Sequence, residues 1–394
     1  MDLFDKCKTF TRAKDAIASG NYPYFRAIES GPGSEVVIDG RKMIMIGSNN
    51  YMGLTGHPKV IEAAVKAVKK YGSGCTGSRY LNGTLDIHIE LEERLADFLK
   101  SETVLCFSTG HHVNQGVISS LTTKGDLIFT DRDDHASIVD GCMLSFAKVV
   151  KYKHNDMSDL EKKLNLYKDK DVGKLIITDG VFSMEGDIAN LPEIIKLAKE
   201  YNIRVYVDDA HSIGVLGKHG RGTGEHFGLE DKVDLHMGTF SKSFSSIGGF
   251  VAGEEDVIHY IKHFARSLIF TASPPPAAVA TVLACLDIIE SEPERLEKLW
   301  QNTRKMLDGY KSLGFDIGNS ETPIIPIKIG KDEDCFAFWK LLFEHGIFAN
   351  PAVSPAVPPN EALLRTSYMA THTEEELDKV LEIFSTLGKK FGII

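Results

Sequence analysis

Between Lys174 and Ser212 the sequence reads KLIITDGVFSMEGDIANLPEIIKLAKEYNIRVYVDDAHS. Two short apolar runs, Lys174–Thr178 and Val205–Val207, lie on either side of a segment with helical spacing, Leu191–Glu200. Such units join parallel strands, because a helical crossover returns the chain to the end of the sheet at which the first strand began. This stretch therefore predicts an α/β fold with a parallel sheet that helices cover on both faces.

The same alternation continues on both sides of this stretch. Four more apolar runs are strand-like: Val104–Phe107, Leu127–Phe129, Val233–Met237 and Gly249–Ala252. Two more segments have helical spacing: Ile138–Phe146 and Met157–Leu166. We expect a large domain over residues 46–289, built on a mostly parallel central sheet.

The N-terminal part predicts an arm over residues 1–45 that ends in a hairpin. Glu35–Asp39 and Lys42–Ile46 are apolar-rich runs around Gly40-Arg41, which is a turn signal. Pro58–Tyr71 then predicts a helix. The apolar residues of that helix fall on one stripe: Val60, Ile61, Ala64, Val65 and Val68.

After about residue 290 the pattern changes to that of a smaller domain. Glu292–Leu313 predicts a long charged helix, and Glu374–Leu387 predicts a final helix. Two strand-like runs, Pro323–Ile329 and Ala362–Ser367, lie between them. We expect residues 290–394 to form a small C-terminal α+β domain.

Composition and charge exclude several classes of protein. The 394 residues are 43% hydrophobic with a formal net charge of −10, which is ordinary for a globular protein and unfavourable for binding nucleic acid. The six cysteines include no C-x-x-C pair, so we expect neither a metal site nor a disulfide framework. No signal peptide is apparent, and the longest apolar run, Ala277–Leu286, is too short for a membrane span. We expect a cytoplasmic protein, with peripheral contact to a membrane left open.

Polar residues after predicted strands are candidates for chemistry, because parallel sheets bind ligands at the carboxyl ends of their strands. Lys242 lies in Thr239-Phe-Ser-Lys-Ser243, directly after one such run. A lysine among apolar residues is easily deprotonated and can form a Schiff base, and the hydroxyls of Thr239 and Ser241 suit a phosphate. A surface lysine in a polar turn would explain this motif equally well.

Asp208 and His211 follow another predicted strand, in Val207-Asp-Asp-Ala-His-Ser212. A carboxylate here can pair with a protonated pyridine nitrogen and turn the ring into an electron sink. The imidazole can reach the phenolic oxygen of the same ring. The alternative is that the acids cap the next helix.

Two further motifs lie at predicted strand ends. In Phe107-Ser-Thr-Gly-His-His112, Gly110 opens a helix whose N–H groups can bind an anion, although the preceding polar residues can also simply cap it. In Asp133-Asp-His-Ala-Ser137, His135 can stack on a flat cofactor, although a lone histidine is more often a satisfied polar residue. Neither motif indicates a functional site by itself, and each becomes informative only together with the other motifs.

The order of the motifs along the chain is phosphate loop, histidine, acid and lysine. About one strand–helix–strand unit separates Asp208 from Lys242, which places them at neighbouring strand ends. Four such coincidences indicate one site that holds pyridoxal phosphate on Lys242.

Taken together, the motifs resemble those of the α-oxoamine synthases, a group of fold-type I pyridoxal phosphate enzymes. The resemblance extends from about Tyr24 to Leu387. The motifs that carry it are Ser48-Asn-Asn-Tyr-Met-Gly-Leu54, Gly72-Ser-Gly-Cys-Thr-Gly-Ser-Arg79, Asn82-Gly-Thr84, His135-Ala-Ser137, Asp208–Ser212 and Thr239–Ser243. The resemblance implies an acyltransferase with an aminotransferase-like fold, and a homodimer with shared active sites.

The resemblance also implies roles for single residues. Lys242 would carry the cofactor, Asp208 would bind its pyridine nitrogen, and His211 its phenolic oxygen. His135 would stack on the ring and touch the carboxylate of the substrate. The residues expected around the phosphate or ring are Gly110, His111, Ser183, Thr239, Ser241 and, reaching across to the other subunit, Thr271.

Three residues are expected at the substrate. Arg365 would clamp the amino-acid carboxylate with its planar fork, Asn49 would contribute from the neighbouring subunit, and Ser78 is a further candidate. A surface ion pair is the other explanation for Arg365. The sequence departs from the family at His111, where an aromatic residue is usual, but a backbone N–H remains available there.

Four stretches indicate the branch of the family: Thr76–Thr84, Phe182–Asp187, Pro355–Pro358 and Ala370–Thr373. They most resemble the bacterial enzymes that condense L-serine with a long-chain acyl-CoA. The expected reaction is the decarboxylative condensation with palmitoyl-CoA to 3-ketodihydrosphingosine.

Other functions stay open. Within the family, the chain could be an 8-amino-7-oxononanoate synthase or a glycine C-acetyltransferase, and outside it an ordinary aminotransferase. A non-catalytic subunit that stabilises an active partner is another possibility. Such a subunit would be expected to lose Lys242 or Asp208, and both are present.

Overall fold

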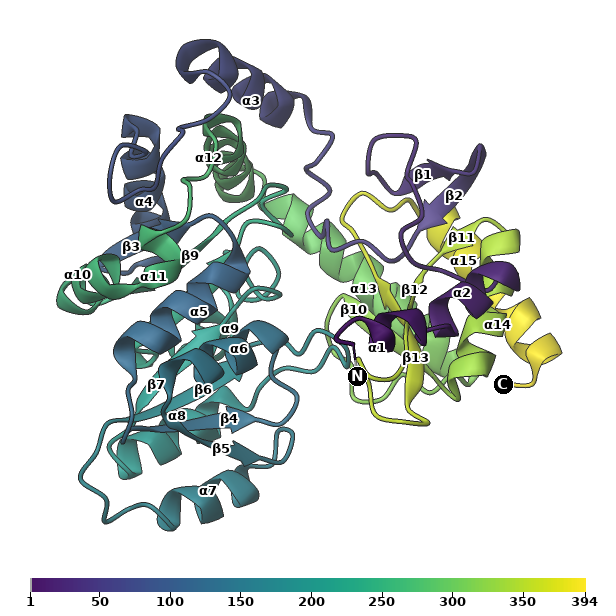
Figure 1. Cartoon of the computed structure of the whole chain (residues 1–394). Coiled ribbons are helices and arrows are strands. Elements are labelled where there is room, and N and C mark those ends of the chain that lie inside the picture. Colours follow the sequence, from purple (N-terminus) through teal and green to yellow (C-terminus); the bar gives the residue numbers. More distant parts are fainter. Residues whose placement is uncertain (1) are drawn as a thin grey trace. The chain divides into compact units, whose positions relative to one another are not determined.

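The computed structural model describes residues 2–394, which divide into two compact units. One unit is continuous, Asn49–Trp300, and the other combines the residues up to Ser48 with Gln301–Ile394. Figure 1 shows their elements coloured along the chain. The domain boundaries expected from the sequence, after residues 45 and 289, remain a prediction.

A seven-stranded sheet forms the centre of the Asn49–Trp300 unit. In order across the sheet, the strands are β3 (Thr103–Phe107), β9 (Gly249–Gly253), β8 (Leu235–Thr239), β7 (Arg204–Asp208), β6 (Lys174–Asp179), β4 (Leu127–Asp131) and β5 (Lys148–Tyr152). β9 runs antiparallel to both of its neighbours, and the other pairs are parallel. The expected α/β fold with a mostly parallel central sheet is confirmed.

One strand of this sheet is absent from the sequence-based prediction. β5 reads Lys-Val-Val-Lys-Tyr and lies at the edge of the sheet, where it pairs with β4 alone. Only Val150 and Tyr152 of its five residues are buried. A half-exposed edge strand lacks the continuous apolar run that marks the central strands, so the apolar pattern did not reveal it.

Helices connect the strands. They are α3 (Pro58–Tyr71), α4 (Asp86–Leu99), α5 (Gly110–Leu121), α6 (Ala136–Ser145), α7 (Met157–Asn165), α8 (Leu191–Glu200), α9 (Thr223–Phe227), α10 (Glu255–Phe264), α11 (Arg266–Ile269) and α12 (Pro276–Ser291), with a 3₁₀ turn at Glu230–Lys232. A further helix, α13 (Pro293–Leu313), continues past the sequence boundary between the units. The helices predicted near α3, α6, α7, α8 and α13 are all present.

The sheet is buried on both faces. Ile177 and Tyr206 belong to a core cluster that includes α5 and α6, whereas Ile176 and Val205 belong to a second cluster with α7 and α8. The two helix pairs accordingly lie on opposite faces of the sheet (Figure 1). Because side chains alternate along a strand, Asp208 lies on the same face as Tyr206, which is the face that α5 covers.

The apolar stripe of α3 is only partly covered. Val60 and Ala67 are buried, but Ile61, Val65 and Val68 are 51%, 46% and 43% exposed. The helix was predicted correctly, but its stripe does not face the core of the chain as an amphipathic helix of a monomer would. A large part of this stripe therefore remains available to another surface.

The second unit contains two three-stranded sheets. One has the order β1 (Glu35–Ile38), β2 (Arg41–Met45), β11 (Ile347–Phe348), and the other β10 (Ile324–Gly330), β13 (Ala362–Ser367), β12 (Asn350–Ala352). Its helices are α1 (Asp5–Lys8), α2 (Arg12–Ala18), α14 (Asp332–Glu344) and α15 (Glu374–Phe391). The predicted strands and final helix of this region are present.

The hairpin turn lies one residue earlier than expected. β1 pairs with β2 so that Ile38 is opposite Arg41, which makes Asp39-Gly40 the two-residue turn. The φ angles there are 52° and 68°, as a type I′ turn requires and as Asp-Gly favours. Among the described residues, no helix is both long and apolar enough to cross a bilayer.

His154 connects three segments near the carboxyl ends of the strands of the large sheet. Its Nδ1 lies 3.1 Å from Asp131 Oδ1 at the end of β4, and its Nε2 lies 3.1 Å from Asp187 Oδ2. Burial alone would lower the pKa of His154, but the hydrogen bonds to the two carboxylates outweigh it and raise the pKa to about 10. Asp133 lies close to the same ring, so the group is an ion-pair cluster around a histidinium.

We expect His154→Ala to lower the free energy of unfolding by about 2–3 kcal/mol at pH 6, because two charge-assisted hydrogen bonds are lost. Denaturant unfolding of both proteins measures the difference. Because folding raises the pKa of His154, its protonated ring stabilises the fold fully at pH values below 6.5, the pKa of an unfolded histidine. This contribution is lost as the pH rises toward about 10. The advantage of the wild type should shrink over that range.

The exposed His226 provides the control. His226→Ala should match the wild type at every pH. Equal stabilities of His154→Ala and wild type at pH 6 would show that the cluster contributes nothing.

Candidate active site

Lys242 lies in a tight loop between the adjacent strands β8 and β9. The Phe240 N–H donates to Gly248 O at 2.9 Å, and the Ser246 N–H donates to Phe240 O at 2.8 Å. The rings of Phe240 and Phe244 are buried and pack edge to face. The apolar anchors on both sides fix the loop, and Lys242 is half-buried between them.

Hydroxyl groups and a helix start lie next to this loop. Thr239 Oγ1 donates to Gly248 O at 3.0 Å and lies 3.0 Å from Ser241 Oγ. Gly110 packs so closely here that a Cβ on it would lie 2.8 Å from Thr239 Oγ1. Since the first N–H groups of a helix have no partner within it, this end of α5 and the hydroxyls together form a set of donors suitable for a phosphate.

Asp208 ends β7 and is 2% exposed. Asn114 Nδ2 donates to its Oδ2 at 2.7 Å, and the Ala210 N–H donates to its Oδ1 at 3.0 Å. β7 pairs with β8, with Asp208 opposite Met237. The register therefore places the carboxylate beside the strand that leads into the Lys242 loop.

His211 follows Asp208 by three residues and is also buried. Its Nδ1 lies 2.7 Å from the hydroxyl of Tyr51, which also lies 3.4 Å from Asn49 Oδ1. Tyr51 was not among the predicted site residues. These contacts attach the segment after Asn49 to the end of β7.

His135 connects the end of β4 to α6. Burial lowers its pKa, the charge of Asp208 raises it, and the charge of Lys242 lowers it. His135, Asp208 and Lys242 lie at or after the ends of β4, β7 and β8, which are strands of one sheet. The charges of His111 and Asp140 act on His135 as well.

Buried carboxylates brace the strand ends below the site. Asp134 accepts the N–H groups of Asp131 and Asp179, and Asp179 accepts the N–H of His135 at 2.8 Å. Burial raises the pKa of Asp179 well above its usual range, and the charge of Asp208 on the neighbouring strand raises it further. These contacts fix the ends of β4 and β6 relative to each other.

Other predicted residues lie around this centre. The His111 ring is tied to Asp140 on α6, with Nε2 and Oδ2 3.0 Å apart. Ser183 is half-buried in the loop after β6. Ser78 forms a β-bridge with Ala272, the residue after Thr271, and its buried Oγ has no hydrogen-bond partner within residues 2–394.

Arg365 is buried on β13 in the other unit, where it pairs with Pro326 of β10. Its contact with a substrate, and the assigned roles of the other site residues, remain predictions.

The sequence-based prediction missed Asn114, Asp179 and Tyr206. Each is buried and hydrogen-bonded at or next to the site. One signal was available for Asn114, because asparagine is unfavourable inside a helix and this one lies one turn after Gly110. Asp179 ends a strand as Asp208 does, but no motif distinguished it.

The residues present fit pyridoxal phosphate. Lys242 supplies the amine, Asp208 an oriented acceptor for a pyridine N–H, and the N–H groups at the start of α5 with the nearby Ser241 hydroxyl the donors for a phosphate. The clearest observation is Gly110, whose missing Cβ allows the helix start to approach the hydroxyls. Amine, acid and anion-binding donors are the three groups that this cofactor requires.

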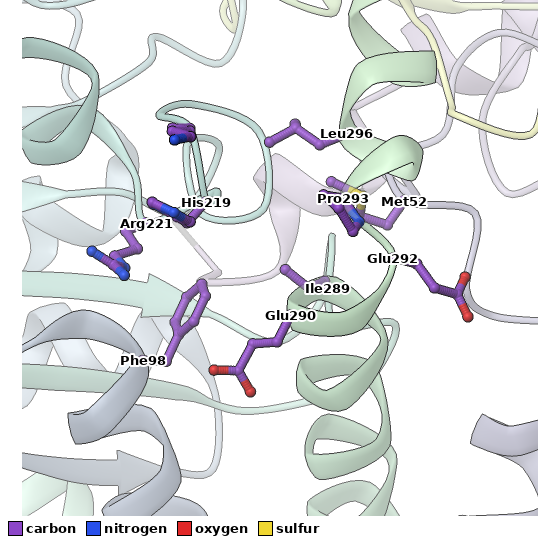
Figure 2. Close-up of a pocket in the computed structure, with 10 residues that line it drawn as sticks. Met52, Phe98, His219, Arg221, Ile289, Glu290, Glu292, Pro293 and Leu296 are labelled. Atoms are coloured by element: carbon purple, nitrogen blue, oxygen red, sulfur yellow. The ribbon is translucent and has the colours of Figure 1, made fainter.

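A separate pocket of about 190 Å³ has a different character (Figure 2). Lys218 and Arg221 line it together with Glu290 and Glu292, and its apolar lining includes Phe98. Arg221 is already paired with Glu230 at 3.3 Å. Acids and bases balance one another here, so this pocket offers no excess of positive charge to a phosphate.

Comparisons with known proteins agree with this geometry. The family model for aminotransferase class I and II matches residues 41–384. Serine palmitoyltransferase of Sphingobacterium spiritivorum is 54% identical over 96% of this chain and 95% of its own, and 8-amino-7-oxononanoate synthase of Thermoanaerobacter pseudethanolicus is 47% identical over 95% of each. A solved structure of SPT with a PLP internal aldimine has a TM-score of 0.97 and 38% identity, with full coverage of both chains.

We expect Gly110→Ala to weaken the binding of pyridoxal phosphate about tenfold, because the new Cβ would push the start of α5 away from Thr239. Titration of the cofactor-free protein, followed by absorbance, measures this dissociation constant. Gly56→Ala is the matched control, since no heavy atom lies within 4 Å of its Cβ position. Unchanged affinity in Gly110→Ala would argue against a phosphate at this helix start.

Proposed function

We propose that the chain is a serine palmitoyltransferase. It belongs to the aminotransferase class I and II family and to its α-oxoamine synthase group. The observation that supports the proposal most is that Asp208 ends β7 while Lys242 follows β8, because these two strands are paired neighbours in the sheet. The similarity over nearly the whole chain is also higher to the relative named serine palmitoyltransferase than to the one named 8-amino-7-oxononanoate synthase.

The proposed reaction joins L-serine to palmitoyl-CoA. A bond forms between Cα of serine and the thioester carbon, the carbon–sulfur bond breaks, and coenzyme A leaves as the thiol. The serine carboxylate is lost as carbon dioxide, and a proton takes its place on Cα. The product is 3-ketodihydrosphingosine, so the enzyme catalyses the first step of sphingolipid synthesis.

Pyridoxal phosphate, when bound, supplies an electron sink for the negative charge that develops at Cα. Lys242 would hold the cofactor and then move the Cα proton with its Nζ. Asp208 would keep the pyridine nitrogen protonated. Its orientation is suited to this, because separate N–H donors bind its two oxygens.

Other residues of the chain would bind and orient the reactants. His135 would stack on the ring and contact the serine carboxylate, and His211 would bind the phenolic oxygen. Arg365 would clamp the same carboxylate through two parallel hydrogen bonds, with help from Asn49. Ser78 supports such a role through a buried hydroxyl that is available for bonding.

The proposal includes a cytoplasmic homodimer in which Thr271 of one subunit reaches the phosphate site of the other. Exposed apolar residues support a partner surface. Ile61, Val65 and Val68 are exposed on α3, and Phe270, directly before Thr271, is 73% exposed. A second copy of the chain would remove this apolar surface from water.

The experiment that tests the function is a titration of the pyridoxal phosphate-loaded protein with L-serine, glycine and L-alanine. We expect serine alone to change the cofactor absorbance at low concentration. A coenzyme A release assay should then show highest turnover with palmitoyl-CoA. Lys242→Ala should lose both turnover and the visible absorbance of the wild type, because the amine that holds the cofactor is removed.

Two results would contradict this assignment. A response to alanine with turnover of pimeloyl-CoA would identify an 8-amino-7-oxononanoate synthase instead. A protein purified without cofactor absorbance, and unable to acquire it, would favour a non-catalytic subunit.

We expect Val65→Glu to convert the dimer into monomers, because a charge would replace an apolar contact on α3. Sedimentation velocity of the pyridoxal phosphate-loaded protein measures its oligomeric state. The monomer should also lose turnover, because Thr271 would no longer reach the second site. Leu166→Glu is the matched control, since Leu166 is equally apolar and 72% exposed but lies at the end of α7. A Val65→Glu protein that remains dimeric would exclude α3 from the interface.

A further inference from the structure

Asn114 is a fully buried polar residue in the interior of α5. Its Nδ2 donates one hydrogen to Asp208 Oδ2 at 2.7 Å and the other to Ser137 Oγ at 2.8 Å. Its Oδ1 accepts the hydroxyl of Tyr206 at 2.6 Å. All of its polar atoms are used, so the side chain has one fixed position.

The partners determine which way the amide points. An ionised carboxylate can only accept hydrogen bonds, so Asp208 requires the nitrogen of Asn114 on its side. Burial raises the pKa of Tyr206 well above its usual range, and the charge of Asp208 raises it further. The hydroxyl therefore stays protonated and donates to Oδ1. A flipped amide would oppose oxygen to the Asp208 carboxylate and nitrogen to the hydroxyl proton.

This orientation determines the direction of the next hydrogen bond. Ser137 Oγ accepts from Asn114 and lies 2.7 Å from His135 Nδ1. The backbone N–H of Ser137 also points to Nδ1, at 3.2 Å. Since Nδ1 already accepts that N–H, it cannot carry a proton of its own, and the Ser137 hydroxyl must donate to it.

We propose that Asn114 and Ser137 are positioning residues that hold His135 as the neutral tautomer with its proton on Nε2. The inference rests on the proposed function in one respect, namely that the exposed Nε2–H is the donor that meets the serine carboxylate. Asn114 thereby couples the acid that faces the pyridine nitrogen to the imidazole that faces the substrate. The buried amide of Asn114 therefore orients both Asp208 and, through Ser137, His135.

The electrostatics of His135 agree with a neutral ring. Burial lowers its pKa; the charges of Lys242 and His111 also lower it, whereas those of Asp208 and Asp140 raise it. The Asp179 carboxyl binds the backbone N–H of His135 and not the ring. A neutral ring can hold a carboxylate by one hydrogen bond without the full attraction of an ion pair. Loss of carbon dioxide then requires the release of a weaker contact.

Nuclear magnetic resonance of ¹⁵N-histidine-labelled, pyridoxal phosphate-loaded protein tests the proposal. The two ring nitrogens report separately whether each carries a proton, and a His135→Gln sample identifies the signals of His135. We expect wild-type His135 near pH 7.5 to be protonated on Nε2 only. No serine or acyl-CoA is needed, so the result does not depend on which substrate the enzyme uses.

Two variants separate this role from simple packing. Ser137→Ala removes one of the two donors to Nδ1, so the pKa of His135 should rise by about one unit, a tenfold change in its protonation equilibrium. Asn114→Asp presents oxygens to Ser137, so the hydroxyl should turn away from His135, and Nδ1 should become protonated in a larger fraction of molecules. Ser120→Ala is the matched control, because Ser120 Oγ is buried on the same helix but donates to Val117 O.

Each outcome either supports or overturns the proposal. Unchanged His135 signals in Ser120→Ala, together with the expected changes in Ser137→Ala, support it, and Ser137→Ala suffices if Asn114→Asp does not fold. A proton on Nδ1 in the wild type overturns it. So does a His135 pKa and tautomer that are the same in Ser137→Ala as in the wild type.

Discussion

The site depends on one buried carboxyl group at the end of β7 that hydrogen bonds hold in place. Asp208 is 2% exposed and lies opposite Asp179 on the neighbouring strand. Ionising two buried carboxyl groups on neighbouring strands is unfavourable in free energy, because like charges repel each other strongly away from water. Burial raises the pKa of Asp179 well above its usual range, and the charge of Asp208 raises it further. Asp208 accepts hydrogen bonds from Asn114 Nδ2 and from the Ala210 N–H.

The parallel sheet explains why residues so distant in sequence meet here. β6, β7 and β8 are neighbours, and their carboxyl ends carry Asp179, Asp208 and the Lys242 loop. The antiparallel strand β9 returns the chain beside β8 and closes that loop tightly. The alternation of side chains directs Asp208 to the face covered by α5. The helix that begins at Gly110, next to Thr239, therefore also supplies Asn114, one turn later.

Apolar periodicity made this fold predictable, and the polar residues that follow the strands indicated the candidate site. Six of the seven strands could be identified, because central strands are continuous apolar runs. The roles of Lys242, Asp208 and His135 stay predictions. β5 was missed because an edge strand with two exposed lysines lacks that run. An asparagine inside a helix was a local signal for Asn114, but its role depends on three partners from other segments. The exposed stripe of α3 illustrates a different limit, since periodicity identifies an apolar face but not the surface that covers it.

The departure from the family at His111 has a physical explanation in the same network. Its ring is half-exposed to solvent, and its Nε2 lies 3.0 Å from Asp140 Oδ2 on α6. His111 lowers the pKa of His135 and Asp140 raises it, so the two partners act on the imidazole in opposite directions. The backbone N–H of residue 111 remains at the start of α5 whatever its side chain is. His111 thus links α5 to α6, the two helices that carry Asn114 and Ser137.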